Sequence, residues 1–290
     1  MNRKKIQFMN ETVTLEQVHQ VHLELIDELD RVCRKHNIRY FIDSGTLLGA
    51  VRHKAAIPWD DDADASMLRS EYEKFRKIAR EELSEGFAFV EPSDLGEKAV
   101  WDFVPCITKL NTRLFDETAE QDYYGHGINN HINLDIFILD DVPDSNLWYY
   151  WKYGMMIVVY GLSMGHRYRL DMSTYTGVSK GIVGILSHIG KLIPAGKLTG
   201  WYDRICQWGT GKNQKKGRCF YGNNLFHLIN TMYQKAWFAE DTALTMSGHV
   251  YNAPKEYDAV LTKMYGDYMT PPPPDQCIGD HCDLSQVRIW

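Results

Sequence analysis

The chain has 290 residues and a formal net charge of −6, and this length suffices for one large domain with a full hydrophobic core. Because nucleic-acid-binding domains are generally basic, the charge argues against nucleic acid as a partner and assigns any phosphate binding to local clusters. The six cysteines lack the paired spacing of a zinc ribbon or a disulfide framework, so we expect reduced thiols.

The chain begins with a predicted helix, strand and second helix. Apolar side chains recur at three- and four-residue steps over residues 14–35, which predicts an amphipathic helix, and Thr14 with Gln17 fits a capping box at its start. Residues 38–42 are mostly β-branched or aromatic and predict a strand. A short helix over residues 46–52 follows, and the free backbone N–H groups at its N-terminus can bind an anion.

The alternation of helices and strands continues to about residue 140. A loop and a strand cover residues 60–68, and a charged helix runs from about residue 70 to residue 82. The last predicted strand contains Asp135 among aliphatic residues, and an acid in so apolar a strand is costly unless it is used or paired. Three strands are predicted after the charged helix, over residues 87–90, 100–110 and 131–139, and the last of them is the strand that contains Asp135.

A run of acidic residues lies before and within the strand over residues 60–68. Alternate residues of a strand face the same side, so three of these acids project together, while Asp61 faces away and is expected to pair with a cation such as Arg52. A neighbouring strand would bring the acid at position 135 alongside them. Carboxylate oxygens on one face suit Mg²⁺ or Mn²⁺. The predicted metal ligands are Asp60, Asp62, Asp64 and Asp135, of which the last three are also the predicted catalytic residues.

Residues upstream of the acidic run are predicted to bind the phosphates of a nucleotide donor. Gly45 and Thr46 stand at the N-terminus of the short helix, where an anion is favoured. Arg52, His53 and Lys54 add positive charge on the loop that follows. Metal ions that bridge these phosphates and the acids would stabilise the charge that develops in phosphoryl transfer.

Two other interpretations of the acidic run remain open in the sequence. The spacing of the three aspartates, with Glu71 at the twelfth position, matches a calcium loop, but Ala65 stands where the sharp turn of such a loop demands glycine. A solvated acidic turn accounts for residues 60–62, but it does not account for Asp64 and Asp135 inside apolar runs.

Beyond residue 143 the composition shifts to apolar and aromatic side chains. The pattern predicts two helices, over residues 147–164 and 178–198. These helices either pack in the core or lie on an anionic membrane surface. Three of the four ligands that a structural zinc site needs could come from Cys277, His281 and Cys282.

The acidic run belongs to a longer string that resembles a known family. Residues 43–64 read Asp-Ser-Gly-Thr-Leu-Leu-Gly-Ala-Val-Arg-His-Lys-Ala-Ala-Ile-Pro-Trp-Asp-Asp-Asp-Ala-Asp. Together with residues 69–75 and the Tyr-Gly-Asp-Tyr element at residues 265–268, this string closely resembles the LicD family of phosphocholine transferases and their relatives, which include fukutin-like proteins. Ala56 stands where relatives often carry an aromatic residue, and Ala63 where Ile or Val is usual.

The resemblance implies the nucleotidyltransferase superfold related to DNA polymerase β, an α+β core in which helices flank a small mixed sheet. It implies that Gly45-Thr46 is the glycine-polar pair of this superfamily, that Asp62 and Asp64 are its metal clamp and that Asp135 is its third acid. It also implies CDP-linked donors and surface-glycan acceptors. Within a single domain over residues 1–290, we predict a catalytic core (14–142), a helical acceptor lobe (143–248) and a C-terminal element that returns to the core (249–290).

Aromatic residues are candidates for the substrate pocket. Trp59, Tyr265 and Tyr268 lie in or beside the motifs, and the two tyrosines are three residues apart, as on one face of a helix. A box of aromatic side chains would favour choline, because a quaternary ammonium group is attracted to ring faces. Trp101 and Tyr123 are further candidates for such a box.

The sequence thus predicts a Mg²⁺-dependent transferase that passes phosphocholine or a related phospho-alcohol from a CDP-linked donor, CDP-choline first, to a hydroxyl of a lipopolysaccharide, teichoic acid or capsule precursor. Asp135 is expected to help deprotonate that hydroxyl. The alternatives are a nucleotidyltransferase that uses an NTP and a non-catalytic protein that binds glycans or nucleotides. No apolar core follows the basic residues of positions 1–8, so we expect a cytoplasmic protein in peripheral contact with the inner membrane face. The alcohol, the acceptor sugar and the oligomeric state stay open.

Overall fold

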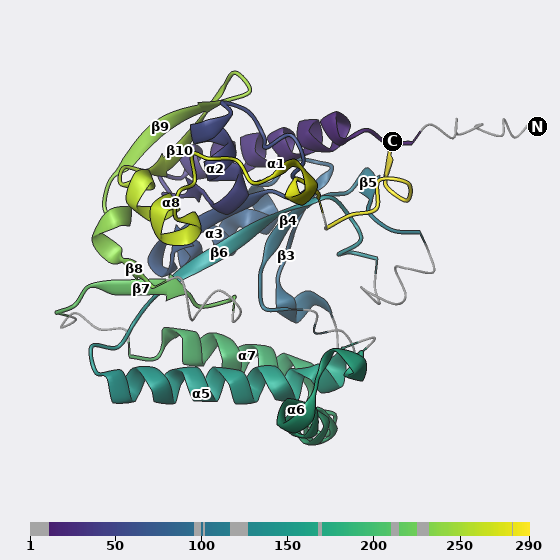
Figure 1. Cartoon of the computed structure of the whole chain (residues 1–290), viewed down its shortest axis with the longest axis vertical. Coiled ribbons are helices and arrows are strands. Elements are labelled where there is room, and N and C mark those ends of the chain that lie inside the picture. The colour runs from purple at the N-terminus through teal and green to yellow at the C-terminus, as the bar shows by residue number, and fades with distance from the viewer. Residues whose placement is uncertain are drawn as a thin grey trace, which may run out of the picture.

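The computed structural model describes residues 12–95, 100, 102–116, 127–167, 170–209, 215–224, 232–279 and 281–290. These residues form an α+β fold in which helices flank a curled mixed sheet, and a separate layer of helices lies beside it (Figure 1). The predicted α+β class is confirmed, whereas the relationship of the core to DNA polymerase β stays a prediction.

The main sheet is mixed. Its strands are β1 (Phe41–Ile42), β2 (Asp64–Leu68), β3 (Phe87–Val90), β4 (Cys106–Lys109), β6 (Asn133–Asp141), β7 (Arg218–Tyr221) and β8 (Tyr233–Gln234). They follow the order β1-β2-β6-β4-β3, while β7 pairs with β6 and with β8. Only β2 and β6 run parallel, and the other pairs of this sheet are antiparallel. Because β4 pairs with the start of β6 and β7 with its end, β6 is the central strand on which the sheet is built.

Three helices pack close to the sheet. α1 (Leu15–Lys35) has the predicted capping box at its start and turns its apolar stripe into the core. α2 (Ser44–Arg52) begins two residues before the predicted start, because the Asp43 side chain accepts the N–H of Ser44 and caps the helix there. α3 (Arg69–Glu82) follows β2 directly and covers the residues predicted for the charged helix. These predictions succeeded because the apolar periodicity of each helix is strong.

Two predicted strands are shorter in the structure. Of residues 38–42 only β1 pairs, because the N–H of Ile38 still bonds the Cys33 carbonyl at the end of α1. Of the described residues between 100 and 110, only those of β4 pair, and the N–H of Val100 instead bonds the carbonyl of His166 in the helical layer. The remaining elements are the hairpin β9 (Asp241–Met246) and β10 (His249–Pro254), the helix α8 (Tyr257–Tyr265) and the strand pair β5 (Thr112–Arg113) and β11 (Arg288–Ile289).

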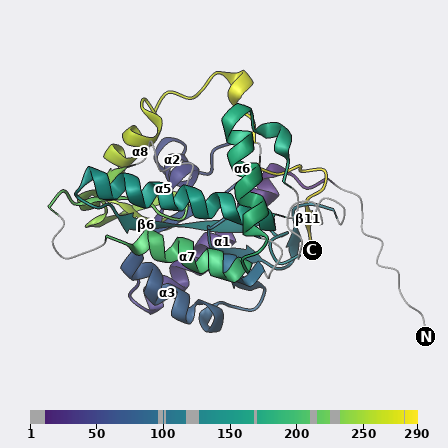
Figure 2. The same ribbon diagram turned by 90° about the horizontal axis from the view of Figure 1, so that it is seen from below.

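The helical layer consists of α5 (Asn146–Ser163), α6 (Gly177–Gly190) and α7 (Ala195–Gln207), and Figure 2 looks onto it. It has a hydrophobic cluster of its own, which joins α5 and α7 to one side of the sheet. Lys152 of α5 is buried there, and its Nζ donates to the carbonyl of Cys206 over 2.5 Å. The methylene groups of this lysine therefore pack as an apolar side chain would, while its ammonium group donates to a backbone oxygen.

The segment predicted as a helical lobe over residues 143–248 is only partly helical. Its described α-helices end with α7, whereas β7 and β8 rejoin the main sheet, a 3-10 helix covers Lys235–Phe238 and β9 begins the hairpin. The sequence pattern missed this return because these strands are short and carry no clear alternation of apolar and polar residues. Within the described residues, no helix is long and apolar enough to span a bilayer.

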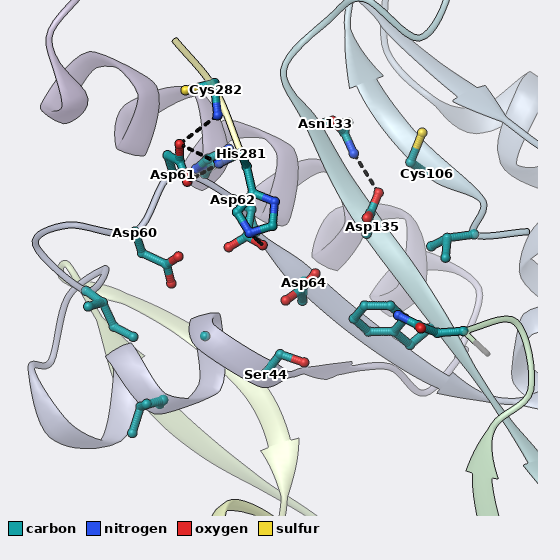
Figure 3. A pocket seen from close by; sticks show the side chains of 18 of the residues that line it. Ser44, Asp60, Asp61, Asp62, Asp64, Cys106, Asn133, Asp135, His281 and Cys282 are labelled. Atoms are coloured by element: carbon teal, nitrogen blue, oxygen red, sulfur yellow. Dashed lines mark hydrogen bonds and ion pairs between the residues drawn. The ribbon is translucent and has the colours of Figure 1, made fainter. Parts of the chain in front are cut away.

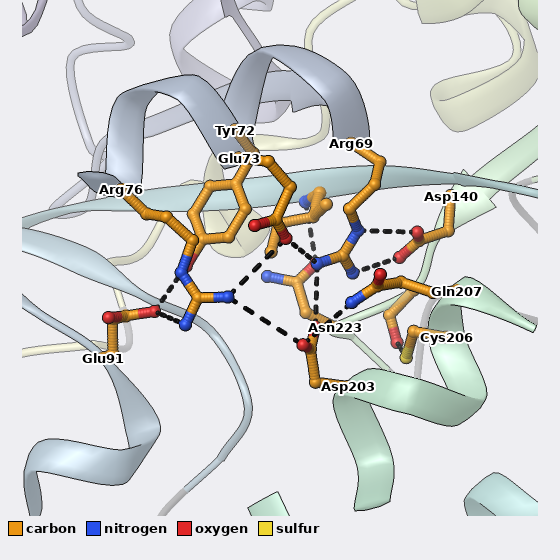
Figure 4. A network of polar contacts seen from close by, with 12 residues as sticks. Arg69, Tyr72, Glu73, Arg76, Glu91, Asp140, Asp203, Cys206, Gln207 and Asn223 are labelled. Carbon is orange, nitrogen blue, oxygen red and sulfur yellow. Dashed lines mark hydrogen bonds and ion pairs between the residues drawn. The ribbon is translucent and has the colours of Figure 1, made fainter. Parts of the chain in front are cut away.

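An ion-pair network connects the sheet to the helical layer (Figure 4). Arg69, at the junction of β2 and α3, donates Nε and Nη2 to the two oxygens of Asp140 on β6, over 2.8 and 2.7 Å. Its Nη1 also donates to Asp203 of α7 over 2.8 Å. Asp140 is fully buried and is held by the bidentate pair, so Arg69 connects the strand that carries the candidate site to Asp203 in the helical layer.

Candidate active site

The pairing of β2 with β6 places two acids side by side. In the parallel register Asp64 lies directly opposite Asp135, as expected from their positions in two apolar strands. Residues paired in this way project from the same face of a sheet. Both side chains line a cleft of about 850 Å³, in which the predicted acidic cluster faces residues from the C-terminal segment (Figure 3).

Two further acids reach this cleft from the loop before β2. Asp62 points toward the centre of the cluster, where its Oδ2 lies 3.3 Å from Nε2 of His281 (Figure 3). Asp60 approaches α2 so closely that a Cβ on Gly45 would collide with its carboxylate. The absence of a side chain at Gly45 thus leaves room for the Asp60 carboxylate in its present position.

Burial and mutual repulsion raise the pKa values of these acids. Burial, followed by the charge of Asp62, raises the pKa of Asp60 to about 8. Burial and the neighbouring carboxylates also hold the pKa values of Asp64 and Asp135 well above the usual range of a carboxyl group. Asn133 donates to Asp135 over 2.6 Å, but no ion pair within the described residues neutralises Asp60, Asp64 or Asp135. Ionisation of the whole cluster would therefore place several uncompensated negative charges in a partly buried position, so these acids retain their protons more tightly than exposed ones.

These side chains fit a divalent cation by type and by charge. Carboxylate oxygens are the ligands that Mg²⁺ and Mn²⁺ prefer, and a cation would relieve the repulsion that raises the pKa values. Within the described ranges, no three acidic, histidine or cysteine side chains already surround one common position. The carboxylates of the cluster would have to converge further around an ion, and metal binding stays a prediction.

The protein without metal is expected to lose stability as the pH rises toward 8. Asp60 titrates near 3.8 when unfolded and near 8 when folded, so the folded state holds its proton more tightly across this window. Its contribution to stability is complete below pH 3.8 and disappears as the pH passes about 8. Urea unfolding in EDTA at several pH values measures this, and Asp60→Asn should flatten the decline. A decline of equal slope in that variant would contradict the assignment to Asp60.

The structure brings only part of the predicted phosphate-binding set to the cleft. Gly45 and Arg52 line it, but Thr46 is buried and its Oγ1 accepts the N–H of Asp64 over 2.9 Å. His53 and Lys54 lie outside the lining, because α2 ends there and the Lys54 carbonyl turns to accept an N–H from the β9–β10 turn. For Thr46, His53 and Lys54, direct phosphate contact is therefore not supported by this geometry.

Asp61 has a different partner from the predicted one. Its carboxylate does not pair with Arg52 but accepts the backbone N–H groups of His281, over 3.1 Å, and Cys282, over 2.8 Å. A Cβ on Gly279 would lie 2.9 Å from the Asp61 carboxyl carbon, so the C-terminal segment approaches this loop closely. Asp61 thus holds the segment that presents His281 to Asp62. No residue in this part of the described chain completes a zinc site with the two sulfur atoms.

Aromatic residues form part of the walls. Trp59, Tyr265 and Tyr268 all line the cleft, as predicted for the substrate pocket. The two tyrosines do not share a helical face, because α8 ends at Tyr265 and Gly266 takes a positive φ of 69°. The Tyr268 hydroxyl donates to Asp258 over 2.7 Å. The candidates at positions 101 and 123 lie outside the described residues.

Sequence reasoning missed several residues that the cleft brings together. Asn133 alternates with Asp135 along β6, and this alternation could have revealed it. The others come from distant segments whose meeting depends on the tertiary fold, and no local pattern marks them. They are Asp102, Phe103, Tyr160, Arg167 and Asn223. His281, which the sequence offered only as a zinc ligand, also lines the cleft.

Comparison with known proteins supports the assignment that the fold and the cleft suggest. Residues 37–156, which contain α2, β2 and β6, match the family model described as the LicD/FKTN/FKRP nucleotidyltransferase domain. This part of the chain, which carries the acids of the cleft, is therefore similar to a nucleotidyltransferase-type domain.

Curated relatives extend this match beyond the domain. A lipopolysaccharide cholinephosphotransferase LicD of Haemophilus influenzae is 26% identical over 272 residues, which cover 90% of this chain and 93% of that protein. Uncharacterised proteins of Rickettsia typhi and Rickettsia prowazekii are 44% and 46% identical over 55 and 48 residues, which cover 18% of each of those proteins. These matches show that the chain is similar to the LicD family, over residues 37–156 and, at lower identity, over most of its length.

Proposed function

We propose that this protein is a phosphotransferase that moves phosphocholine, or a related phospho-alcohol, from a CDP-linked donor to a hydroxyl of a cell-surface glycan precursor of the lipopolysaccharide type. The observation that carries the proposal is the register that sets Asp64 beside Asp135 in a cleft shared with Asp62. The full-length similarity to a lipopolysaccharide cholinephosphotransferase supplies the substrate class. Teichoic acid and capsule precursors are further acceptors of the same chemical kind.

The reaction forms one bond and breaks one. The acceptor oxygen bonds to the phosphorus that carries the alcohol, the phosphoanhydride bond to CMP breaks, and the hydroxyl proton passes to a carboxylate. Asp135 suits that role, because burial and neighbouring charges raise its pKa and make it a better base than an ordinary carboxylate. The proton acceptor and the acceptor hydroxyl would then meet on the floor of the cleft.

The proposed metal is held by the acidic cluster. Asp62, Asp64 and Asp135 would bind Mg²⁺ or Mn²⁺, with Asp60 close by, and the bound cation supplies charge stabilisation for the phosphates. Of the three basic residues that were predicted to bind the donor phosphates, Arg52 lines the cleft, and it offers the donor a second contact. The positive charges of the cation and of Arg52 would offset the negative charges of the acids, so that the cleft could bind an anionic substrate.

The aromatic part of the cleft suits the alcohol. Trp59, Tyr160 and Tyr265 line the cleft together with Asp102, and ring faces beside a carboxylate attract a quaternary ammonium group. This chemistry favours choline over ribitol or glycerol, which carry no charge. We place the reaction on the cytoplasmic side of the membrane, where the predicted peripheral contact would bring the protein to a lipid-linked acceptor.

Product analysis with a purified acceptor tests the proposed function. The protein is incubated with CDP-choline, Mg²⁺ and a lipopolysaccharide that lacks phosphocholine, and nucleotide products are separated. Release of CMP together with phosphocholine on the glycan is the expected result. Release of pyrophosphate from an NTP would instead establish the nucleotidyltransferase alternative, and release of neither nucleotide product would overturn the proposal.

Donor binding should also stabilise the fold. At a concentration of 100 times its Kd, a donor that binds only the folded state adds about 2.7 kcal/mol to the free energy of unfolding. For a domain of this size the melting temperature should rise by about 5 °C or more. Thermal shifts with CDP-choline, CDP-ethanolamine, CDP-ribitol, CDP-glycerol and NTPs, each with and without Mg²⁺, rank the donors. A shift of equal size for CTP and CDP-choline would contradict recognition of the alcohol.

A further inference from the structure

The outer face of α6 carries an apolar stripe that no described residue covers. Its members recur at steps of four and three residues along one side of the helix, and they are between 46% and 84% exposed. On the opposite side, Gly161 and Gly190 allow α5 and α6 to approach closely, since a Cβ at either would meet atoms of the other helix. The stripe therefore faces away from α5. It consists of Val178, Ile182, Ile185 and Ile189 of α6, and Leu192 continues it just beyond the end of the helix.

α5 extends this apolar surface with aromatic side chains. Its inner side, which includes Met156 and Val159, packs against the second hydrophobic cluster. Its outer side leaves seven large apolar residues between 39% and 76% exposed. Tryptophan and tyrosine are the residues that favour the interface between lipid and water. The exposed residues of α5 are Leu147, Trp148, Tyr150, Trp151, Met155, Ile157 and Val158.

The same layer is basic within an acidic protein. Residues 145–202 contain six lysines and arginines and one acid, so they carry +5, whereas the rest of the chain carries −11. Lys180, Lys191 and Lys197 are exposed and make no ion pair within the described residues. Positive charge that borders an uncovered apolar stripe complements an anionic surface.

We infer that α5 and α6 form a docking surface for a bilayer that contains anionic phospholipids. The apolar stripe of α6 and the aromatic residues of α5 would enter the interface between headgroups and acyl chains, and the lysines would bind the headgroup phosphates. The face that Figure 2 shows is the one that would meet the bilayer. The use of this surface, to hold the cleft near a lipid-linked glycan, rests on the proposed function, whereas the docking itself rests on the surface alone.

Vesicle flotation with the full chain tests the docking surface. We expect binding to vesicles of phosphatidylglycerol and phosphatidylcholine, weak binding to pure phosphatidylcholine, and loss of binding as salt is raised. Ile185→Ser should weaken binding about tenfold. The matched control is Val250→Ser on β10, which is 52% exposed on the hairpin at the opposite side of the molecule and should bind as the wild type does (Figure 1).

A second pair of variants tests the charge. Lys180→Gln and Lys191→Gln should each weaken binding about fivefold. Lys77→Gln on α3 and Lys263→Gln on α8, both exposed and outside the layer, should leave binding unchanged. Equal losses in the two sets would overturn the docking surface, as would equally tight binding of the wild type to neutral vesicles. A dimer that Ile185→Ser converts to a monomer, without vesicle binding, would assign the stripe to a second copy of the chain instead.

The two proposals fail in different ways. Vesicle binding requires neither donor nor acceptor, and transfer to a delipidated, soluble acceptor requires no membrane. CMP release from the soluble acceptor with no vesicle binding overturns docking alone. Vesicle binding with no CMP release from any donor overturns the proposed function alone.

Discussion

Replacement of Asp64 by asparagine is expected to lower kcat/KM by at least about 10³-fold while the fold stays intact. Asp64 lies at the start of β2, directly opposite Asp135, and its carboxylate is a central part of the negative charge in the cleft. Asparagine keeps the shape of the side chain but removes that charge. Because the neighbouring acids repel Asp64, its neutralisation should not reduce the free energy of unfolding. Steady-state kinetics and urea unfolding measure the two effects separately.

The control for this prediction lies on the neighbouring strand. Asp141 ends β6 and pairs with Lys235 over 2.7 Å, away from the cleft, so Asp141→Asn should change kcat/KM by less than about twofold. Asp135→Asn should match Asp64→Asn in its loss of activity. If Asp64→Asn retained activity like that of the wild type, the assignment of Asp64 to the metal clamp would be wrong.

Replacement of Arg69 by methionine is expected to reduce the free energy of unfolding by about 3–5 kcal/mol. Arg69 is the bidentate partner of the buried carboxylate of Asp140, and its loss leaves that charge unpaired. Methionine retains much of the apolar stem, so the loss reports mainly the unpaired charge. Burial already raises the pKa of Asp140 despite the arginine, and the variant should therefore take up a proton at this site when it folds. Denaturant unfolding at several pH values measures the loss.

An exposed arginine of α3 provides the matched control. Arg80 pairs with Asp94 over 2.7 Å, but its side chain is half exposed, and Arg80→Met should cost less than about 1 kcal/mol. Asp140→Asn in the Arg69→Met background should recover part of the loss, because it removes the unpaired charge. Equal losses for the two arginine variants would show that the network in Figure 4 contributes no more than a surface pair.

The sequence predicted the elements in which local patterns are strong. α1 with its capping box and α3 follow the apolar periodicity, and β6 contains nearly all of the strand predicted from its aliphatic run. The adjacency of Asp64 and Asp135 was also predicted, because an acid inside each of two apolar strands points to a shared use. The catalytic and metal-binding roles of these acids stay predictions.

The sequence could not determine contacts between segments far apart in the chain. Asp61 was expected to pair with Arg52, but the fold brings the backbone of residues 281–282 to it from the other end of the chain. Thr46 was expected at the phosphates, but its hydroxyl holds the start of β2. In each case the local pattern identified a polar side chain, while the partner depended on long-range packing that a single sequence does not show.

The helical layer also shows which features follow from the local sequence and which depend on tertiary packing. The sequence determined that residues 147–164 form an apolar helix, because composition and periodicity are local properties. The single helix predicted over residues 178–198 is wrong, because the structure ends α6 at Gly190 and begins α7 at Ala195, after Pro194. The sequence did not determine whether the apolar faces of these helices are buried, because burial depends on which other elements pack against them. The tertiary structure decided this, since α5 and α7 share one hydrophobic cluster while the stripe of α6 stays exposed. Likewise, the sequence alone identified the acids of the family motif, and only the parallel register of β2 and β6 brought them into one cleft.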